Sequence, residues 1–189
     1  MESVRRPILD LLSRYRPHDP AEAADVGRVR ELTRTADDPW SRSIPLHTTA
    51  SALIVHPGSG RVLMRWHERQ RSWLHVGGHG DPGETEPLAV ALREAAEETG
   101  LGDLVPFPDD SLVQLVIVPV PARGDEPAHA HADLRFVLAT AEPDAIRPES
   151  PEAPLRWLSL PEAREATAEA NVREGLRRVE ELLAGAPRG

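Results

Sequence analysis

The sequence predicts an α/β (α+β) fold, an α/β/α sandwich in which helices cover a mixed β-sheet, with a helical extension at the N-terminus. Three observations support this prediction. Apolar residues first recur at helical spacing and then gather in short runs rich in β-branched residues. A helical pattern divides these runs into two groups, and another helical pattern follows the last run. Helices between and after strands are typical of a sheet that packs against helical layers.

The N-terminal part of the chain is expected to be helical. Apolar residues spaced three or four apart predict an amphipathic helix over 3–16, and a weaker helical pattern covers 20–37. We assign 1–42 to a helical extension and 43–189 to one main domain. A chain of 189 residues is long enough for one core of ordinary size but short for two full domains.

The strands of the sheet are predicted from five apolar runs. The turn signal PGSG joins the first two runs into a hairpin, and a polar loop joins the next two into a second pair. A C-terminal helix is expected to start near Asn171, after the fifth run. The five runs cover 47–55, 61–66, 111–120, 131–140 and 155–160.

Charge and composition narrow the classes of function. The formal net charge of −9 argues against a nucleic acid or an acidic membrane surface as partner, and so favours a small molecule. The sequence has no cysteine, so a disulfide, a thiol nucleophile and a thiolate metal site are excluded. The charged amphipathic start does not resemble a signal peptide, and no apolar run has the length of a membrane span, so we expect a cytoplasmic protein. A homodimer is left open.

The stretch GGHGDPGETEPLAVALREAAEETGL, residues 77–101, carries an unusual group of acidic residues. Glu94, Glu97 and Glu98 share one face of the helix predicted over 86–99. Leu88, Leu92, Ala95 and Thr99 form an apolar flank, so we expect the helix to pack on the sheet with one side and bind metal with another. Like charges at this spacing repel, so a purely structural helix has little reason to gather them. A solvated glutamate-rich helix is the alternative. A bound cation is the interpretation that explains the grouping.

Glycines before this helix permit a close approach of the backbone to the acidic face. Gly77, Gly78, Gly80 and Gly83 allow tight turns that bring main-chain carbonyls and amides near the carboxylates. Mg²⁺ and Mn²⁺ prefer carboxylates, carbonyls and water, and Mg²⁺ usually shares its shell with substrate phosphates. The predicted chemistry is therefore hydrolysis of a diphosphate with a divalent cation.

This stretch resembles the Nudix box of the Nudix hydrolases, whose consensus is Gly, five residues, Glu, seven residues, then Arg-Glu-apolar-any-Glu-Glu-any-Gly-apolar. The C-terminal half matches at every specified position over 93–101. Eight residues, not seven, separate Glu84 from Arg93, and we expect the turn before the helix to absorb the extra one. A looser resemblance extends over about 45–165.

The resemblance implies a Nudix fold and hydrolysis of the diphosphate linkage of a nucleoside diphosphate joined to another moiety, by water attack at phosphorus. It implies that Glu97 and Glu98 bind Mg²⁺ or Mn²⁺, that Glu94 is a metal ligand or general base, and that the Gly77 carbonyl completes the shell. Arg93 joins Glu94 and Glu98 as the catalytic set, with Glu84 in support. A non-catalytic Nudix-fold module that senses a ligand or binds a partner is the alternative.

A second polar group lies on the strand predicted at 131–140. Alternation along a strand places His129, His131, Asp133 and Arg135 on one face. In the functional interpretation this face turns toward the acidic helix and, with His79, offers imidazoles to phosphate or metal. An ordinary solvent-exposed face is the alternative. The substrate-binding candidates are His79, Arg65, His129, His131 and Arg135.

Overall fold

The structure is a computed structural model that describes residues 2–185. Four helices lie at the predicted positions, and no helix within the described range is long and apolar enough to cross a membrane. The helices are α1 (Glu2–Arg14), α2 (Pro20–Thr35), α3 (Pro87–Thr99), α4 (Leu160–Ala166), α5 (Ala170–Gly185) and the 3₁₀ turn η1 (Pro143–Ala145). The strands are β1 (Leu46–His56), β2 (Arg61–His67), β3 (Ser72–Leu74), β4 (Val76–His79), β5 (Val105–Pro106), β6 (Gln114–Val120), β7 (His129–Ala139) and β8 (Leu155–Ser159).

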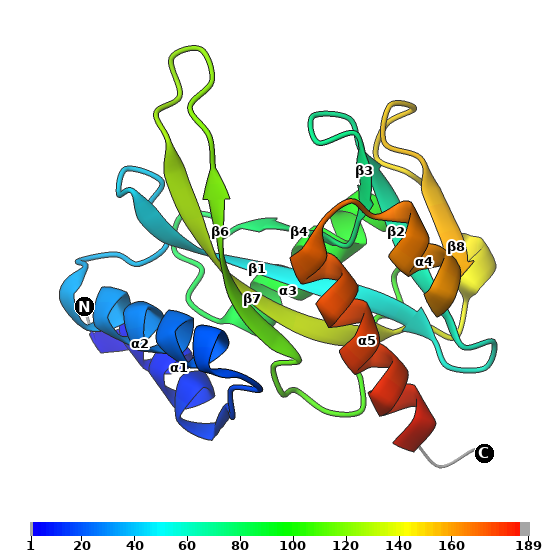
Figure 1. The fold of residues 1–189 in the computed structure, drawn as a ribbon, viewed down its shortest axis with the longest axis horizontal. Helices are drawn as coiled ribbons and strands as arrows, with labels where there is room; N and C mark the ends of the chain where they lie inside the picture. Colours follow the sequence, from blue (N-terminus) through cyan, green and yellow to red (C-terminus); the bar gives the residue numbers. More distant parts are fainter. Residues whose placement is uncertain (1, 186–189) are drawn as a thin grey trace.

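The described strands form one mixed eight-stranded sheet with β1 at its centre (Figure 1). On one side β1 pairs in parallel with β7. Its other side is shared by two antiparallel partners, with β4 beside 49–52 and β2 beside 54–56. The predicted pairs β1–β2 and β6–β7 are both present, and β8 pairs with β2. The glycine loop expected from Gly77 instead begins after β4, which extends to His79.

Helices cover both faces of the sheet, as predicted for an α/β/α sandwich. Helix α3 lies behind the sheet in Figure 1, while α5 crosses in front of it. The hydrophobic clusters agree with this view, because Ala95 of α3 packs with Ala52 of β1, whereas Leu176 of α5 packs with Leu53. Successive residues of β1 therefore serve opposite layers, as the alternation of a strand requires.

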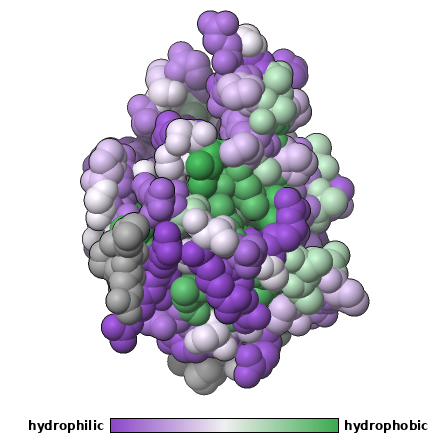
Figure 2. All heavy atoms as spheres, turned by 90° about the vertical axis from the view of Figure 1, so that its left-hand side faces the viewer, coloured by the Kyte–Doolittle hydropathy of each residue, from purple (hydrophilic) through white to green (hydrophobic). Residues whose placement is uncertain are grey.

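The N-terminal helices α1 and α2 lie on the same side of the sheet as α3. Ile8, Leu12 and Val29 are fully buried in one cluster with Leu115 and Phe136 of the sheet. The extension therefore shares the core of the main domain, and its boundary at residue 42 stays a prediction. Figure 2 views the molecule from the left-hand side of Figure 1, where α1 and α2 lie, and shows an apolar area framed by polar residues.

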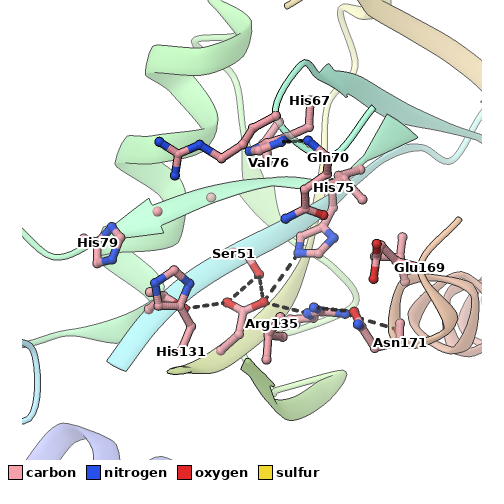
Figure 3. A pocket seen from close by; sticks show the side chains of 18 residues that line it. Ser51, His67, Gln70, His75, Val76, His79, His131, Arg135, Glu169 and Asn171 are labelled. Atoms are coloured by element: carbon pink, nitrogen blue, oxygen red, sulfur yellow. Dashed lines mark hydrogen bonds and ion pairs between the residues drawn. The ribbon is translucent and has the colours of Figure 1, made fainter. Parts of the chain in front are cut away.

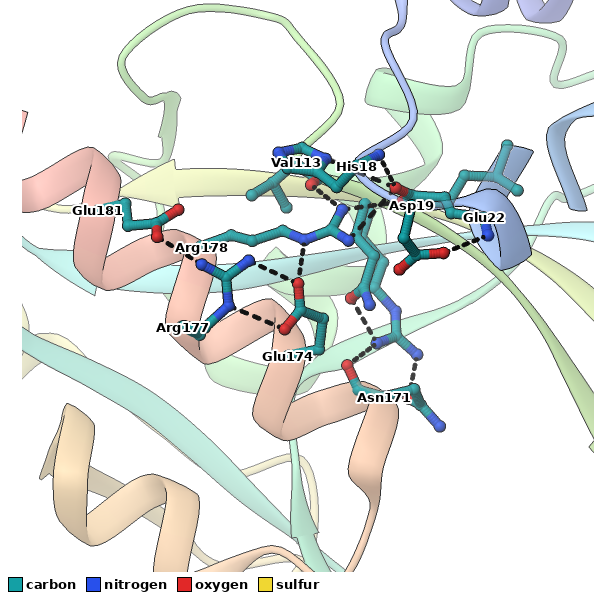
Figure 4. Close-up of polar contacts among 12 residues, drawn as sticks. His18, Asp19, Glu22, Val113, Asn171, Glu174, Arg177, Arg178 and Glu181 are labelled. Atoms are coloured by element: carbon teal, nitrogen blue, oxygen red, sulfur yellow. Dashed lines mark hydrogen bonds and ion pairs between the residues drawn. The ribbon is translucent and has the colours of Figure 1, made fainter. Parts of the chain in front are cut away.

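A buried ion pair connects α2 to α5. The guanidinium of Arg178 donates from Nη1 to Oε1 of Glu22 over 2.8 Å (Figure 4). Tyr15 also donates to this carboxylate. The backbone N–H of Leu115 in β6 donates to the same oxygen over 3.1 Å. Burial raises the pKa of Glu22, but these partners outweigh it and lower the pKa to about 2. The carboxylate thus joins α2, β6, α5 and Tyr15, the residue that follows α1.

Candidate active site

Helix α3 is regular over its whole length. Pro87 occupies its first turn, where the missing N–H has no helical partner to lose, and Gly100 ends it with a left-handed φ of 71°. The helix starts at Pro87, three residues after Glu84. That the turn between them takes up the extra residue of the box stays a prediction.

The structure corrects the prediction that one side of α3 packs while another binds metal. The side chains of Glu94 and Glu98 are only 17% and 14% exposed, whereas that of Glu97 is 58% exposed. Glu94 follows the buried Val90 by four residues, so it lies on the packing side of the helix. Two of the three carboxylates therefore point toward the sheet.

The glycines of β4 make room for these carboxylates. A Cβ atom on Gly78 would lie 2.5 Å from Oε2 of Glu94, which is closer than van der Waals contact allows. The backbone N–H of Gly77 donates to Oε2 of Glu98 over 3.1 Å. A side chain at Gly78 would displace the Glu94 carboxylate, because the acidic helix lies directly against β4.

Arg93 brings the acidic residues together. Its Nε and Nη2 atoms donate to both carboxylate oxygens of Glu84 over 2.9 Å each, so Glu84 lies beside the box arginine. Nη1 donates to Glu94 over 2.9 Å and to Glu97 over 3.0 Å. Nη2 also donates to the carbonyl of His79 over 2.9 Å. These bonds, that with Glu84 foremost, raise the pKa of Arg93, so the guanidinium stays charged.

Glu98 lies beside Arg65, which was predicted to bind substrate. Nη1 of Arg65 is 3.3 Å from Oε1 of Glu98, and Nη2 donates to Glu149 over 3.1 Å. Burial raises the pKa of Glu98 to about 7, although Arg65 and the Gly77 N–H oppose it. Burial likewise raises the pKa of Glu94, with partial compensation by Arg93. The guanidinium groups of Arg65 and Arg93 therefore offset only part of the effect of burial on the pKa values of Glu94 and Glu98.

The polar face of β7 turns away from α3, contrary to the interpretation that it faces the acidic helix. Leu134 and Phe136 pack on the side of α3, so His131, Asp133 and Arg135 must project to the side of α5. There they line a cavity of about 290 Å³. Figure 3 shows His79 and His131 at one end of this pocket, and Glu169 and Asn171 at the other.

The middle of the pocket is held by a buried ion pair between Asp133 and Arg135. Nε of Arg135 donates to Asp133 over 2.7 Å, and Nη2 donates to Oδ1 of Asn171 over 2.8 Å. Burial raises the pKa of Asp133, but Arg135 and His75 outweigh it, so the pKa is lowered and the carboxylate stays ionised. Arg135 is only 2% exposed, and its contacts fix the pocket wall to the start of α5. Its predicted role in binding substrate stays a prediction.

Four histidines gather where His79 and His131 line the end of the pocket away from Asn171. His79 and His131 were predicted to act together, and their ring centroids are 4.8 Å apart. His129 lies beside His131, with 3.2 Å between their Nε2 atoms. The sequence analysis missed His47, whose Nε2 lies 3.1 Å from Nε2 of His79. Burial, Arg42 and the neighbouring histidines lower the pKa of His79 to about 3, and burial and the other histidines lower that of His131 to about 4.

Gly78→Ala is expected to reduce turnover about 10²-fold, because the new methyl group displaces the Glu94 carboxylate and small displacements at a catalytic site have effects of this size. The fold should survive, since the atom in contact is the end of a flexible side chain. Gly102→Ala is the matched control, because nothing lies within 4 Å of a Cβ atom there. Steady-state kinetics of both variants check the prediction. Equal activity in the two variants would contradict it.

Comparison with known proteins agrees with this geometry. Residues 45–179 match the family model described as NUDIX domain. A Lactococcus lactis subsp. cremoris protein named "Probable DHNTP pyrophosphohydrolase" is 34% identical over 125 residues, which cover 64% of this chain and 68% of that protein.

Two solved structures share the fold. A C. elegans Ap4A hydrolase has a TM-score of 0.59 at 22% identity, and the match covers 74% of this chain and 98% of that one. The E. coli dihydroneopterin triphosphate pyrophosphohydrolase has a TM-score of 0.57 at 21% identity, with 74% and 96% covered. The family model covers most of the chain, including the acidic helix and its glycine strand, and the chain therefore belongs to the Nudix family as a Nudix hydrolase.

Proposed function

We propose that this Nudix hydrolase cleaves the diphosphate linkage of a nucleoside diphosphate joined to another moiety, with Mg²⁺ or Mn²⁺ bound by Glu94, Glu97, Glu98 and the Gly77 carbonyl. One observation carries the proposal. The guanidinium of Arg93 holds Glu84, Glu94 and Glu97 together. Glu98, on the same helix as Glu94 and Glu97, accepts a hydrogen bond from the backbone N–H of Gly77 in β4. A helix with only a structural role has no need of this grouping.

The residues present fit a hard divalent cation. All the donors are oxygens, which Mg²⁺ and Mn²⁺ prefer. Glu98 adds a second argument, because burial raises its pKa to about 7 and a cation would favour its charged form. When bound, such a cation neutralises phosphate charge and lowers the pKa of a water ligand.

The remaining steps belong to the chain's own side chains. Arg93 fixes the orientation of Glu94 and Glu97 by charge-assisted hydrogen bonds. Glu98 or Glu94 accepts the proton of the attacking water as it approaches phosphorus. Arg65 lies next to Glu98 and is 16% exposed, so its guanidinium is placed to pair with phosphate oxygens. His79, His129, His131 and Arg135 stay substrate-binding candidates on the pocket side.

The names of the related proteins guide the choice of substrates. Those names specify a DHNTP pyrophosphohydrolase, an Ap4A hydrolase and a dihydroneopterin triphosphate pyrophosphohydrolase. We propose the shared substrate class, a small molecule with a phosphate chain on a heterocyclic moiety. A nucleic acid or a membrane is not proposed as partner, given the net charge of −9. A cytoplasmic location and a homodimer stay predictions.

A panel of substrates tests the proposal. Dihydroneopterin triphosphate, dinucleoside polyphosphates, nucleotide sugars, ADP-ribose, NADH and NTPs should be incubated with the full chain and Mg²⁺ or Mn²⁺, and the released products separated by chromatography. Turnover of at least one compound, lost on metal chelation, is the expected result. Tight binding of a compound without any turnover would instead favour a non-catalytic ligand-sensing module.

Mg²⁺ or Mn²⁺ alone is expected to raise the melting temperature, because binding to the native state stabilises it by about 2.7 kcal/mol at a hundredfold excess over Kd. Glu97→Gln should remove much of this shift. Glu152→Gln, at another exposed glutamate, should keep it. Thermal unfolding of the three proteins with and without metal is the measurement. An unchanged shift in Glu97→Gln would exclude Glu97 as a ligand.

A further inference from the structure

Three histidines from three neighbouring strands project from the same face of the sheet. His47 of β1 is the direct partner of His131 in the parallel strand β7. His79 of β4 is the partner of Thr49, which lies two residues from His47 and therefore faces the same way. This pairing brings three imidazoles together on the side of the pocket, on the face of the sheet opposite to α3.

The ring nitrogens of these histidines converge on one point. One nitrogen from each of His47, His79 and His131 lies within 4.8 Å of the other two. The Nε2 atoms of His47 and His79 are already 3.1 Å apart. Nitrogen ligands bound to one Zn²⁺ each lie about 2.0–2.1 Å from it, so this nitrogen-to-nitrogen distance suits a shared ion. Small side-chain rotations would bring the third nitrogen equally close.

A further contact prepares His47 as a ligand. Its Nδ1 lies 3.0 Å from the carbonyl of Ile44, and a hydrogen bond donated to this carbonyl leaves the Nε2 lone pair directed at the cluster. A backbone carbonyl that fixes the ring of a ligating histidine in this way is a regular feature of metal sites. His129 has a similar contact, with Nδ1 3.0 Å from the carbonyl of Pro127.

We propose that His47, His79 and His131 form a second metal site, for a cation that prefers imidazole, of the class of Zn²⁺, Co²⁺ or Ni²⁺. The ligands are all nitrogen, so the site discriminates against Mg²⁺, in contrast to the carboxylates of α3. Three protein ligands leave a fourth position for water, a phosphate oxygen of a ligand, or His129. That position opens to the pocket, because His79 and His131 line it.

The alternative is a set of histidines that only bond to each other. In that case His79 donates to His47, and His129 and His131 form a second pair, with no need for metal. Such pairs would use two nitrogens at a time and give no preference among divalent cations. The two interpretations therefore differ in stoichiometry and in selectivity.

The test begins with the full chain after removal of metal by a chelator. Equilibrium dialysis against Zn²⁺ with excess Mg²⁺ should give one tightly bound zinc per chain. Co²⁺ should give the intense visible absorption of a four-coordinate site, without thiolate bands because the chain has no cysteine. A weak octahedral Co²⁺ spectrum in the parent protein would overturn the proposal, whatever the variants do.

Variants locate the site. His79→Asn and His131→Asn, both at partly exposed positions, should weaken Zn²⁺ binding at least about 10²-fold, which is the upper end of the effect of losing a mere outer-shell partner. His56→Asn, at a histidine outside the cluster, should bind as the parent does. Glu98→Gln should keep the Co²⁺ spectrum, since its carboxylate belongs to the other site. Loss of the spectrum in Glu98→Gln, or parent-like zinc binding in both histidine variants, would overturn the assignment. Because these measurements use metal alone, they are independent of the proposed hydrolysis.

Discussion

Glu98→Gln is expected to reduce turnover by about 10²- to 10⁴-fold while the protein stays folded. The substitution preserves the shape of a side chain that is 14% exposed and accepts a hydrogen bond from the Gly77 N–H. It removes one negative charge from the proposed metal site and one proton acceptor for the attacking water. Both losses slow the chemical step, so a higher substrate concentration does not restore turnover.

Two measurements separate chemistry from stability in this variant. Turnover should be measured at saturating Mn²⁺, with Glu94→Gln as the comparison, and we expect Glu98→Gln to be the more damaged of the two. Urea unfolding without metal should show no loss of stability, because burial already disfavours the charged form of Glu98. Activity close to that of the parent in both variants would refute the catalytic role of α3.

Arg178→Met is expected to lower the free energy of unfolding by about 3–5 kcal/mol, the usual effect of removing one partner of a buried ion pair. Arg178 is 3% exposed at its side chain and reaches Glu22, which would be left buried without its cation. Arg177→Met is the control on the same helix. Its side chain is 44% exposed and paired at the surface, so about 0–1 kcal/mol is expected. Similar losses in the two variants would contradict the prediction.

The stability effect should depend on pH with a definite sign. The pKa of Glu22 in the folded protein is lowered to about 2, from an ordinary value of 4.5. The ionised Glu22 therefore contributes its full share to the free energy of unfolding above about pH 4.5, and this share is lost as the pH falls toward 2. The difference in unfolding free energy between the parent and Arg178→Met should narrow over this range. Urea titrations from pH 7 down to pH 3 would measure it.

The main elements of the fold were predictable because each carries its own local signal. The turn PGSG between two apolar runs fixed the β1–β2 hairpin, and helical spacing fixed α1 and α5. Strand β4 was missed because its glycines indicate a loop, whereas they allow the strand to lie against α3. The parallel pairing of β1 with β7 joins segments far apart in sequence, so no local sequence pattern predicts this pairing.

The same distinction applies to the candidate site. Arg93 and its carboxylates lie on one helix, so spacing alone was enough to group them. Which side of that helix packs depends on the glycines of β4, and the sequence analysis placed Glu94 and Glu98 on the wrong side. The contact of His47 with His79 and the place of Asn171 in the pocket were missed because long-range pairing brings these residues to His79 and Arg135. A histidine at the start of a strand was the only available signal for His47.

The position of β1 between β4, β2 and β7 has a consequence for insertions and deletions. The strand gives alternate residues to the two faces, Ala50 and Ala52 to the layer of α3, and Thr49 and Ser51 to the pocket. One residue added or lost within 47–53 would exchange these sets, placing hydroxyls against α3 and methyl groups beside Asp133. Both faces would be damaged by the same event. Natural homologues should therefore keep the length of this strand constant and vary instead at the exposed turn 121–128 between β6 and β7.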